Sequence, residues 1–155
     1  MVRSTLSVIV IDAKIGLAQL LPLPYSPAVN RQMQIWSRYK NRLVVPTLWW
    51  YEIAAGLRKA IVMGAINLTK ANEALEQVAS MGLEELVPSK KISQLALAWA
   101  EQIRQSNTYD AQYLAMAEYI GAEFWTADAA LAEAARQTGA AWVHWVGETL
   151  GKKGA

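Results

Sequence analysis

Hydrophobic and polar positions along this chain alternate between short, nearly continuous apolar runs and longer segments with helical spacing. Short runs bounded by proline, glycine or polar residues predict β-strands. The five runs are TLSVIVID (5–12), RLVVP (42–46), LEELVP (83–88), AEFWTA (122–127) and AAWVHWV (140–146). The pattern therefore predicts five short strands, each separated from the next by other structure.

The segments between the strands predict seven helices, because apolar residues recur in them at helical intervals. They are AKIGLAQLL (13–21), AVNRQMQIWSRYKN (28–41), LWWYEIAAGLRKAIVMG (48–64), TKANEALEQVASMG (69–82), KKISQLALAWAEQIRQS (90–106), YDAQYLAMAEYIG (109–121) and DAALAEAARQTG (128–139). Thr47, Ser89 and Thr108 are predicted N-caps, and Gly64 is a predicted helix stop. Strands alternating with helices predict an α/β fold: a central parallel five-stranded sheet flanked by helices on both faces.

The length of 155 residues favours a single domain with a substantial core. We expect residues 1–147 to form it and residues 148–155 to be a frayed tail. The first apolar run ends on an acid and precedes no small-residue cleavage site, so it is predicted to be a strand rather than a signal peptide. No apolar stretch approaches the ~20 residues of a membrane span. The absence of cysteine excludes disulfides and thiolate zinc sites, and fits a cytoplasmic protein.

Charge is distributed unevenly along the chain. Residues 1–62 carry eight Lys or Arg and two acids, whereas residues 63–155 carry seven Lys or Arg and eleven acids. A basic half suggests a polyanionic partner, and solvated surface charge is the alternative. Four basic residues gather around Trp36 and are a candidate contact for an RNA backbone, or simply a solvated helix face. They are Arg31, Arg38, Lys40 and Arg42.

Only three of the 13 acidic residues are aspartates, and each adjoins a regular apolar segment. Asp12 ends the first predicted strand, Asp128 follows the fourth, and Asp110 lies in the first turn of a helix. Glu52 interrupts a very apolar helix. Because ligands of open α/β sheets bind at the carboxyl ends of the strands, these acids are expected to collect there. Asp110 and Asp128 could also be ordinary helix-terminal acids, and Glu52 a surface glutamate.

Four carboxylates that converge from four segments would repel one another, and a divalent cation removes that penalty. An all-oxygen ligand set suits Mg²⁺ or Mn²⁺ rather than zinc, and Mg²⁺ commonly meets a phosphate group in its site. The implied chemistry is metal-assisted attack of water on a phosphodiester.

Four stretches of the chain resemble PIN-domain ribonucleases, most closely the VapC-type toxins of prokaryotic toxin–antitoxin pairs. The stretches are VIVIDAKIG, VPTLWWYEIAAGLRKA, TYDAQYLAMAEYIGAEFWTADAAL and AAWVHW. The third is the most specific, because a YDA helix, a glycine turn and an apolar strand ending in Thr-x-Asp are typical of these toxins. The resemblance covers nearly the whole chain.

This resemblance implies a Mg²⁺- or Mn²⁺-dependent endoribonuclease, often a homodimer, that a small antitoxin protein neutralises. Asp12, Glu52, Asp110 and Asp128 match the metal-binding acids of the family, and Thr126 matches a polar residue that supports the site. Lys14 departs from the small or polar residue that is common at its position. It could bind a substrate phosphate, or it could occupy the place of the metal. Residues 21–40 are also unusually long and proline-rich.

Two other functions compete with this interpretation. A catalytically idle PIN-like module would bind only a protein or RNA, and Lys14 keeps this alternative open. A phosphate-binding regulatory domain of flavodoxin-like shape would need a second acid beside Asp12, which is absent. His144 is the only histidine and is expected to be structural. The chain therefore lacks the residues that a Ser–His hydrolase or a zinc hydrolase needs.

Tryptophan is used seven times in this chain. Trp99 and Trp125 are predicted to lie in the core. Trp49 and Trp50 are adjacent and cannot share one helix face, so at least one is expected at an interface or groove. A protein interface is favoured over base stacking.

Overall fold

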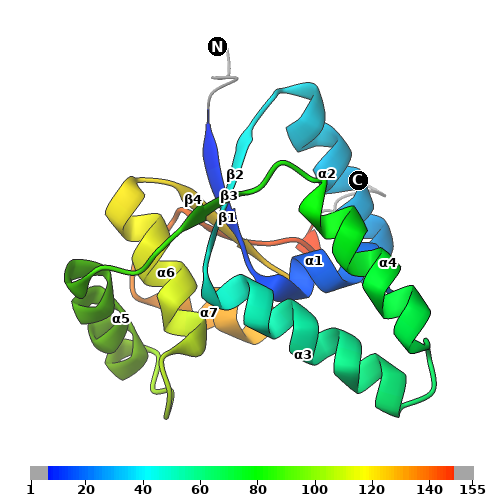
Figure 1. Cartoon of the computed structure of the whole chain (residues 1–155). Coiled ribbons are helices and arrows are strands. Elements are labelled where there is room, and N and C mark those ends of the chain that lie inside the picture. Colours follow the sequence, from blue (N-terminus) through cyan, green and yellow to red (C-terminus); the bar gives the residue numbers. More distant parts are fainter. Residues whose placement is uncertain (1–6, 149–155) are drawn as a thin grey trace.

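The computed structural model describes residues 7–148, which form five strands and seven helices (Figure 1). The strands are β1 (Val8–Ile11), β2 (Arg42–Pro46), β3 (Glu84–Leu86), β4 (Glu123–Thr126) and β5 (Val143–Trp145). The helices are α1 (Ala13–Leu20), α2 (Ser26–Arg38), α3 (Leu48–Val62), α4 (Leu68–Ala79), α5 (Lys90–Gln102), α6 (Tyr109–Ile120) and α7 (Ala129–Gln137). Of the predicted tail, residues 149–155 lie outside the described residues.

All strand pairs in the sheet are parallel, in the order β3-β2-β1-β4-β5, which confirms the predicted fold class. The chain builds outward from β1 to β2 and β3, and then returns to the other side of β1 to add β4 and β5. The direction of winding therefore reverses between β1 and β4. In open α/β sheets, ligand-binding crevices form at such a reversal, outside the carboxyl ends of the strands.

Helices cover the sheet on both faces. In Figure 1, α1, α2, α3 and α4 lie to the right of the strands, and α5 and α6 lie to the left. Helix α6 packs across β1, β2 and β4, while α1 contacts β4 and α3 contacts β2. Ile9, Val10 and Ile11 are consequently fully buried, although successive strand residues point to opposite faces. This burial explains why β1 is a continuous apolar run.

Two glycines bring α1 close to α3. A Cβ atom at Gly16 would lie 2.5 Å from Cζ2 of Trp49, and one at Gly56 would overlap the side chain of Leu17. Neither position has room for a larger residue. The close packing fixes the distance between the end of β1, where α1 begins, and the middle of α3. These are the segments that carry Asp12 and Glu52.

Helix starts differ in detail from the predictions. Ser89 caps α5 by accepting a hydrogen bond from the Ile92 amide, as predicted. Thr47 and Thr108 occupy the N-cap positions of α3 and α6 as predicted, but their side chains make no capping hydrogen bond. Thr47 already has helical backbone angles, with φ −55° and ψ −30°, which do not suit a capping side chain.

Two further helices begin earlier than predicted. Helix α2 begins at Ser26, because a proline in its first turn is compatible with a helix. Helix α4 begins at Leu68 rather than at Thr69, because Asn67 is its cap.

Candidate active site

Asp12 and Asp128 lie at the reversal between β1 and β4, where each follows the carboxyl end of its strand. Thr126, the last residue of β4, is fully buried between them. Its hydroxyl donates a 2.5 Å hydrogen bond to Asp12 Oδ2 and accepts one of 2.9 Å from the backbone amide of Asp128. Thr126 therefore holds both aspartates in place.

Both aspartates also cap helices. Asp12 Oδ1 accepts a hydrogen bond from the Ile15 amide at the start of α1, and Asp128 Oδ1 accepts one from the Leu131 amide at the start of α7. The capping role proposed as an alternative for Asp128 is therefore real, and Asp12 has the same role. In each case the second carboxylate oxygen makes a different contact, so capping does not account for the whole side chain.

Glu52 and Asp110 come from the other direction, on α3 and α6. The Tyr113 hydroxyl donates a 2.5 Å hydrogen bond to Glu52 Oε1, and Gln105 Nε2 donates one of 3.0 Å to Asp110 Oδ2. Neutral donors thus orient both carboxylates without cancelling their charge. Asp12, Glu52 and Asp110 together line one cavity of about 250 Å³.

Lys14 is the basic residue of this cavity. Its Nζ atom lies 3.0 Å from Asp128 Oδ2. Burial alone would lower the pKa of Lys14, but the hydrogen bond to Asp128 and the nearby charges of Asp110 and Asp12 outweigh burial and raise it. The side chain therefore stays protonated beside the carboxylates, and it ties Asp128 to the rim of the cavity.

Burial dominates the acid–base behaviour of the central carboxylates. It raises the pKa of Asp12 to about 6, although the bonds from Thr126 and the Ile15 amide and the charge of Lys14 act against it. Burial likewise raises the pKa of Glu52, against the hydrogen bond from Tyr113. The charge of Asp110 raises both values further, so these three carboxylates interact with one another.

The chemistry of these residues fits a divalent cation. Within residues 7–148, no three His, Cys, Asp or Glu side chains already stand close enough to surround one ion. However, Asp12, Glu52 and Asp110 share a cavity, repel one another and offer only oxygen atoms, the ligand type that Mg²⁺ and Mn²⁺ prefer. Glu52 and Asp110 are only half-buried, which leaves their side chains room to turn toward an ion.

Sequence reasoning missed Tyr113, Gln105 and Tyr25 as parts of this site. Tyr113 lies three residues after Asp110 on α6, so helical spacing could have indicated that it shares the same face. Burial is the main cause that raises the pKa of Tyr25, and the nearby charge of Asp12 raises it further. For Gln105 and Tyr25 the sequence carries no comparable signal.

Other residues flagged in the sequence lie elsewhere. His144 stacks on Trp125 with ring centroids 4.8 Å apart, and its Nε2 lies 3.8 Å from Glu123 Oε1. Trp125 is half-buried against the core rather than fully buried. Trp49 is completely buried, and the half-buried Trp50 donates a hydrogen bond to Glu85. An interface role for Trp50 stays a prediction.

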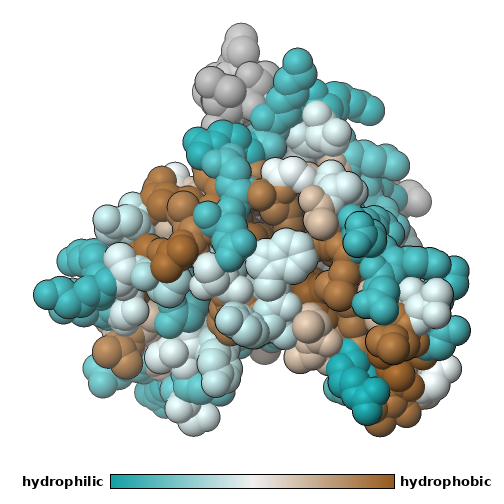
Figure 2. Space-filling model, in the orientation of Figure 1, coloured by the Kyte–Doolittle hydropathy of each residue, from teal (hydrophilic) through white to brown (hydrophobic). Residues whose placement is uncertain are grey.

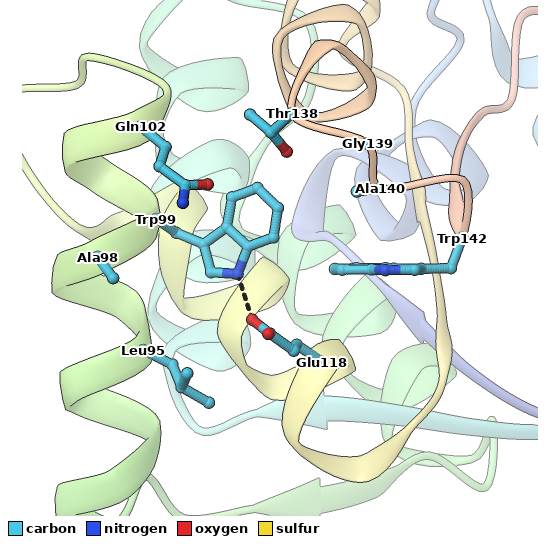
Figure 3. Close-up of a pocket in the computed structure, with 9 residues that line it drawn as sticks. All are labelled: Leu95, Ala98, Trp99, Gln102, Glu118, Thr138, Gly139, Ala140 and Trp142. Carbon is cyan, nitrogen blue, oxygen red and sulfur yellow. Dashed lines mark hydrogen bonds between the residues drawn. The ribbon is translucent and has the colours of Figure 1, made fainter.

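A second cavity, of about 310 Å³, lies between α5, α6 and the turn after α7 (Figure 3). Trp99, which is buried as predicted, meets Trp142 edge-on with ring centroids 5.8 Å apart. The Trp99 indole also donates a 2.7 Å hydrogen bond to Glu118. None of the predicted site residues lines this cavity, so it does not belong to the acidic site.

The protein is thus an α/β domain with a parallel sheet. Its acidic residues lie at the carboxyl edge of the sheet, where the direction of winding reverses between β1 and β4. The comparisons identify the family: residues 9–137 match the PIN domain, and the chain belongs to that family. This confirms the resemblance stated from the sequence. Among curated protein sequences, none matches this chain.

Solved structures support the same fold. PAE2754 from Pyrobaculum aerophilum is 23% identical, with a TM-score of 0.66 over 94% of this chain and 87% of that protein. VapBC2 from Rickettsia felis, bound to a promoter DNA fragment, is 13% identical, with a TM-score of 0.63 over 89% of this chain and 98% of that protein. VapC20 from Mycobacterium tuberculosis, a Sarcin-Ricin loop cleaving toxin, is 12% identical, with a TM-score of 0.59 over 81% of this chain and 94% of that protein. At these identities the likeness concerns the fold.

Proposed function

We propose that this protein is a Mg²⁺- or Mn²⁺-dependent endoribonuclease and the toxin of a toxin–antitoxin pair. The observation that carries the proposal is the cavity at the winding reversal, which three carboxylates from β1–α1, α3 and α6 share. Membership of the PIN family and the likeness to VapC20, which is a cleaving toxin, support the same activity.

Each residue of the site has a separate task in this proposal. Asp12, Glu52 and Asp110 would hold the cation, with Asp128 at the rim as the fourth acid. When bound, the cation would activate a water molecule and offset the negative charge of the phosphate. Thr126 orients Asp12, while Tyr113 and Gln105 orient Glu52 and Asp110.

Partners follow from the same proposal. The substrate would be RNA, and a small antitoxin protein would neutralise the enzyme, since one solved structure with the same fold is a toxin–antitoxin complex from Klebsiella pneumoniae. Figure 2 shows an apolar patch at the lower right, over the turn between α3 and α4, where Val62, Met63 and Leu68 are each about two-thirds exposed or more. This patch is a candidate protein contact.

We also expect a homodimer and a cytoplasmic location. Tyr51 and Tyr109, which are 75% and 56% exposed, line one surface cavity and could meet a second copy. No helix within residues 7–148 has the length and apolar character needed to cross a membrane.

The test is cleavage of total cellular RNA by the purified protein, with Mg²⁺ or Mn²⁺ and with chelator. Asp12→Asn and Glu52→Gln should each lower cleavage by at least about 100-fold, because an amide supplies no charge to the cation. Thr138→Val is the matched control and should cleave like the parent, because Thr138 lines the cavity beside α5 and not the acidic cavity. Retained RNA binding without metal-dependent cleavage in the parent would favour the catalytically idle module instead.

A further inference from the structure

Lys14 connects the fourth acid of the candidate active site to the cavity that the other three share. That cavity, of about 250 Å³, is lined by Lys14 and by three acids, Asp12, Glu52 and Asp110. Asp128 is not among the described residues that line it. The Lys14 ammonium group donates a 3.0 Å hydrogen bond to Asp128 Oδ2, so it reaches from the cavity to the rim. Three acids are thus inside the cavity, and the fourth is paired with a cation beside it.

The fold needs only one of the two carboxylate oxygens of Asp128. Its Oδ1 atom accepts a 3.1 Å hydrogen bond from the Leu131 amide and caps α7, while its backbone amide donates to the Thr126 hydroxyl. Its Oδ2 atom is the one that Lys14 binds. If the ammonium group left, the cap would stay intact and one charged oxygen would lose its cationic partner.

The ion pair between Lys14 and Asp128 can exchange partners. The two side chains are 43% and 31% exposed, and ion pairs with this much solvent contact are weak. Lysine carries its charge on a flexible four-carbon stem and binds phosphate as a point charge. The ammonium group can therefore turn to a phosphate without any movement of the backbone of α1.

A phosphate in this cavity meets charges that mostly repel it. Three carboxylates line the cavity, and Lys14 is the one basic residue among the described residues that line it. The nearest protein partner for a phosphate is therefore the same ammonium group that holds Asp128. Substrate and Asp128 compete for one cation.

We propose that Lys14 is a latch on Asp128 that an RNA phosphate opens, so that substrate and divalent cation bind cooperatively. This inference rests on the proposed nuclease function. In the free protein the ammonium group pairs with Asp128. When RNA binds, the ammonium group moves to the phosphate, and Asp128 Oδ2 becomes available as an additional negatively charged oxygen for the cation. Lys14 is then the residue through which the substrate brings the fourth acid into the site.

The test is calorimetric titration with Mn²⁺, alone and with a saturating short phosphorothioate oligoribonucleotide, whose linkages resist hydrolysis. The oligonucleotide should tighten Mn²⁺ binding to the parent several-fold. By linkage, Mn²⁺ should tighten oligonucleotide binding by the same factor, so a second titration checks the first. The readout is the coupling between two binding events and involves no cleavage.

Variants of the two partners isolate the latch. Lys14→Met should bind Mn²⁺ more tightly than the parent without oligonucleotide, and the oligonucleotide should add much less, since Asp128 is already free. Asp128→Asn keeps an oxygen that can cap α7 but offers no charge, so its coupling should fall in the same way. The double variant should lose no more coupling than either single variant, because both changes break one interaction.

Lys40→Met is the matched control. Lys40 is exposed in the turn before β2, and together with Gln19 it lines a different cavity, of about 800 Å³, at the amino ends of β1 and β2. The same substitution there removes a positive charge far from the acids. This variant should keep both the Mn²⁺ affinity and the coupling of the parent.

Three results would overturn the latch, and they separate it from the proposed function. Equal coupling in the parent and in Lys14→Met would overturn the latch and leave metal binding and the nuclease proposal standing. Weaker Mn²⁺ binding by Lys14→Met without oligonucleotide would do the same, because the ammonium group would then not withhold Asp128 from the cation. A parent that binds no Mn²⁺ even with oligonucleotide would overturn the proposed function and the latch together.

Discussion

The two ends of the same strands are built on opposite principles. At the carboxyl edge the polar groups are charged, and each acid has a donor: Thr126 for Asp12, Tyr113 for Glu52 and Gln105 for Asp110. At the amino edge the buried polar groups are neutral and unpaired, as in Trp36 and Asn41. The carboxyl edge is thus short of positive charge, whereas the amino edge is short of hydrogen-bond partners.

This difference indicates what each edge can accept. A cluster of repelling carboxylates is stabilised by a cation, and neutral donors that orient them leave their charge available. Unpaired amides and an indole N–H are satisfied by a neutral polar group or by water. The described residues of the amino edge include no buried acid, so the two edges should respond differently to pH, metal and mutation.

The largest expected difference is in pH dependence. Because burial raises the folded-state pKa of Asp12 to about 6, against an ordinary value of 3.8, the native state binds more protons than the unfolded state between these values. The free energy of unfolding should therefore fall as pH rises from 4 to 7, by about 3 kcal/mol from this residue. Burial of Glu52 acts in the same direction.

Denaturant unfolding in chelator at several pH values measures this effect. Asp12→Asn should remove most of the slope between pH 4 and 7, whereas Gln19→Leu at the amino edge should retain it. A parent whose stability rises with pH across this window would contradict the assignment of a buried, repelled carboxylate to Asp12.

The second difference concerns hydroxyl groups. Thr126→Val removes a group that both donates to Asp12 and accepts from the Asp128 amide, inside a fully buried position. It should lower the free energy of unfolding by about 1–3 kcal/mol, because both partners lose a bond. Thr138→Val changes an exposed residue whose hydroxyl donates to the Ala135 carbonyl, and it should cost less than about 1 kcal/mol. Equal losses in thermal unfolding would mean that Thr126 has no special role at the acidic edge.

Much of the carboxyl edge was predictable because its residues break a pattern. Asp12 interrupts a buried strand and Glu52 an apolar helix, and parallel topology alone implies that strand-end acids meet at one edge. The partners were not predictable, since the contact of Tyr113 with Glu52 depends on how α6 packs against α3. Likewise, the Thr47 side chain makes no capping hydrogen bond, because the residue itself has helical backbone angles.

The amino edge left no comparable signal in the sequence. Gln19 and Asn41 are ordinary polar residues at a helix end and a turn, and nothing about their spacing indicates that they lack partners. The basic residues were noticed, but without strand order they could not be assigned to an edge. Charge in an apolar segment is visible in a sequence, whereas an unpaired neutral atom is visible only in a structure.

A third prediction concerns the role of Lys14. Its ammonium group pairs with Asp128 and lies among the carboxylates, so it competes with a divalent cation. Lys14→Met should tighten Mn²⁺ binding several-fold, since a positive charge leaves the cavity. Isothermal titration with Mn²⁺ measures this. A weaker Mn²⁺ affinity, together with a salt dependence of RNA binding that is lower by roughly one phosphate contact, would instead show that Lys14 binds substrate.

The smallest effects compare one stabilising change at each edge. In chelator, Asp110→Asn removes a charge that raises the pKa of Asp12 and Glu52, and relief of that repulsion should exceed the helix-dipole stabilisation it loses, about 0.3–1 kcal/mol. Lys40→Gly relieves a left-handed residue and should stabilise by about 0.5–1 kcal/mol. Both variants should therefore melt slightly above the parent.

Added Mn²⁺ then separates the two edges. It should raise the melting temperature of the parent and of Lys40→Gly alike, because a ligand that binds only the native state stabilises it by mass action. Asp110→Asn should gain much less, since one ligand of the cation has been replaced by an amide. If Asp110→Asn melts below the parent in chelator and gains as much from Mn²⁺, then Asp110 is a helix-terminal acid, and the carboxyl edge holds its cation with the remaining acids alone.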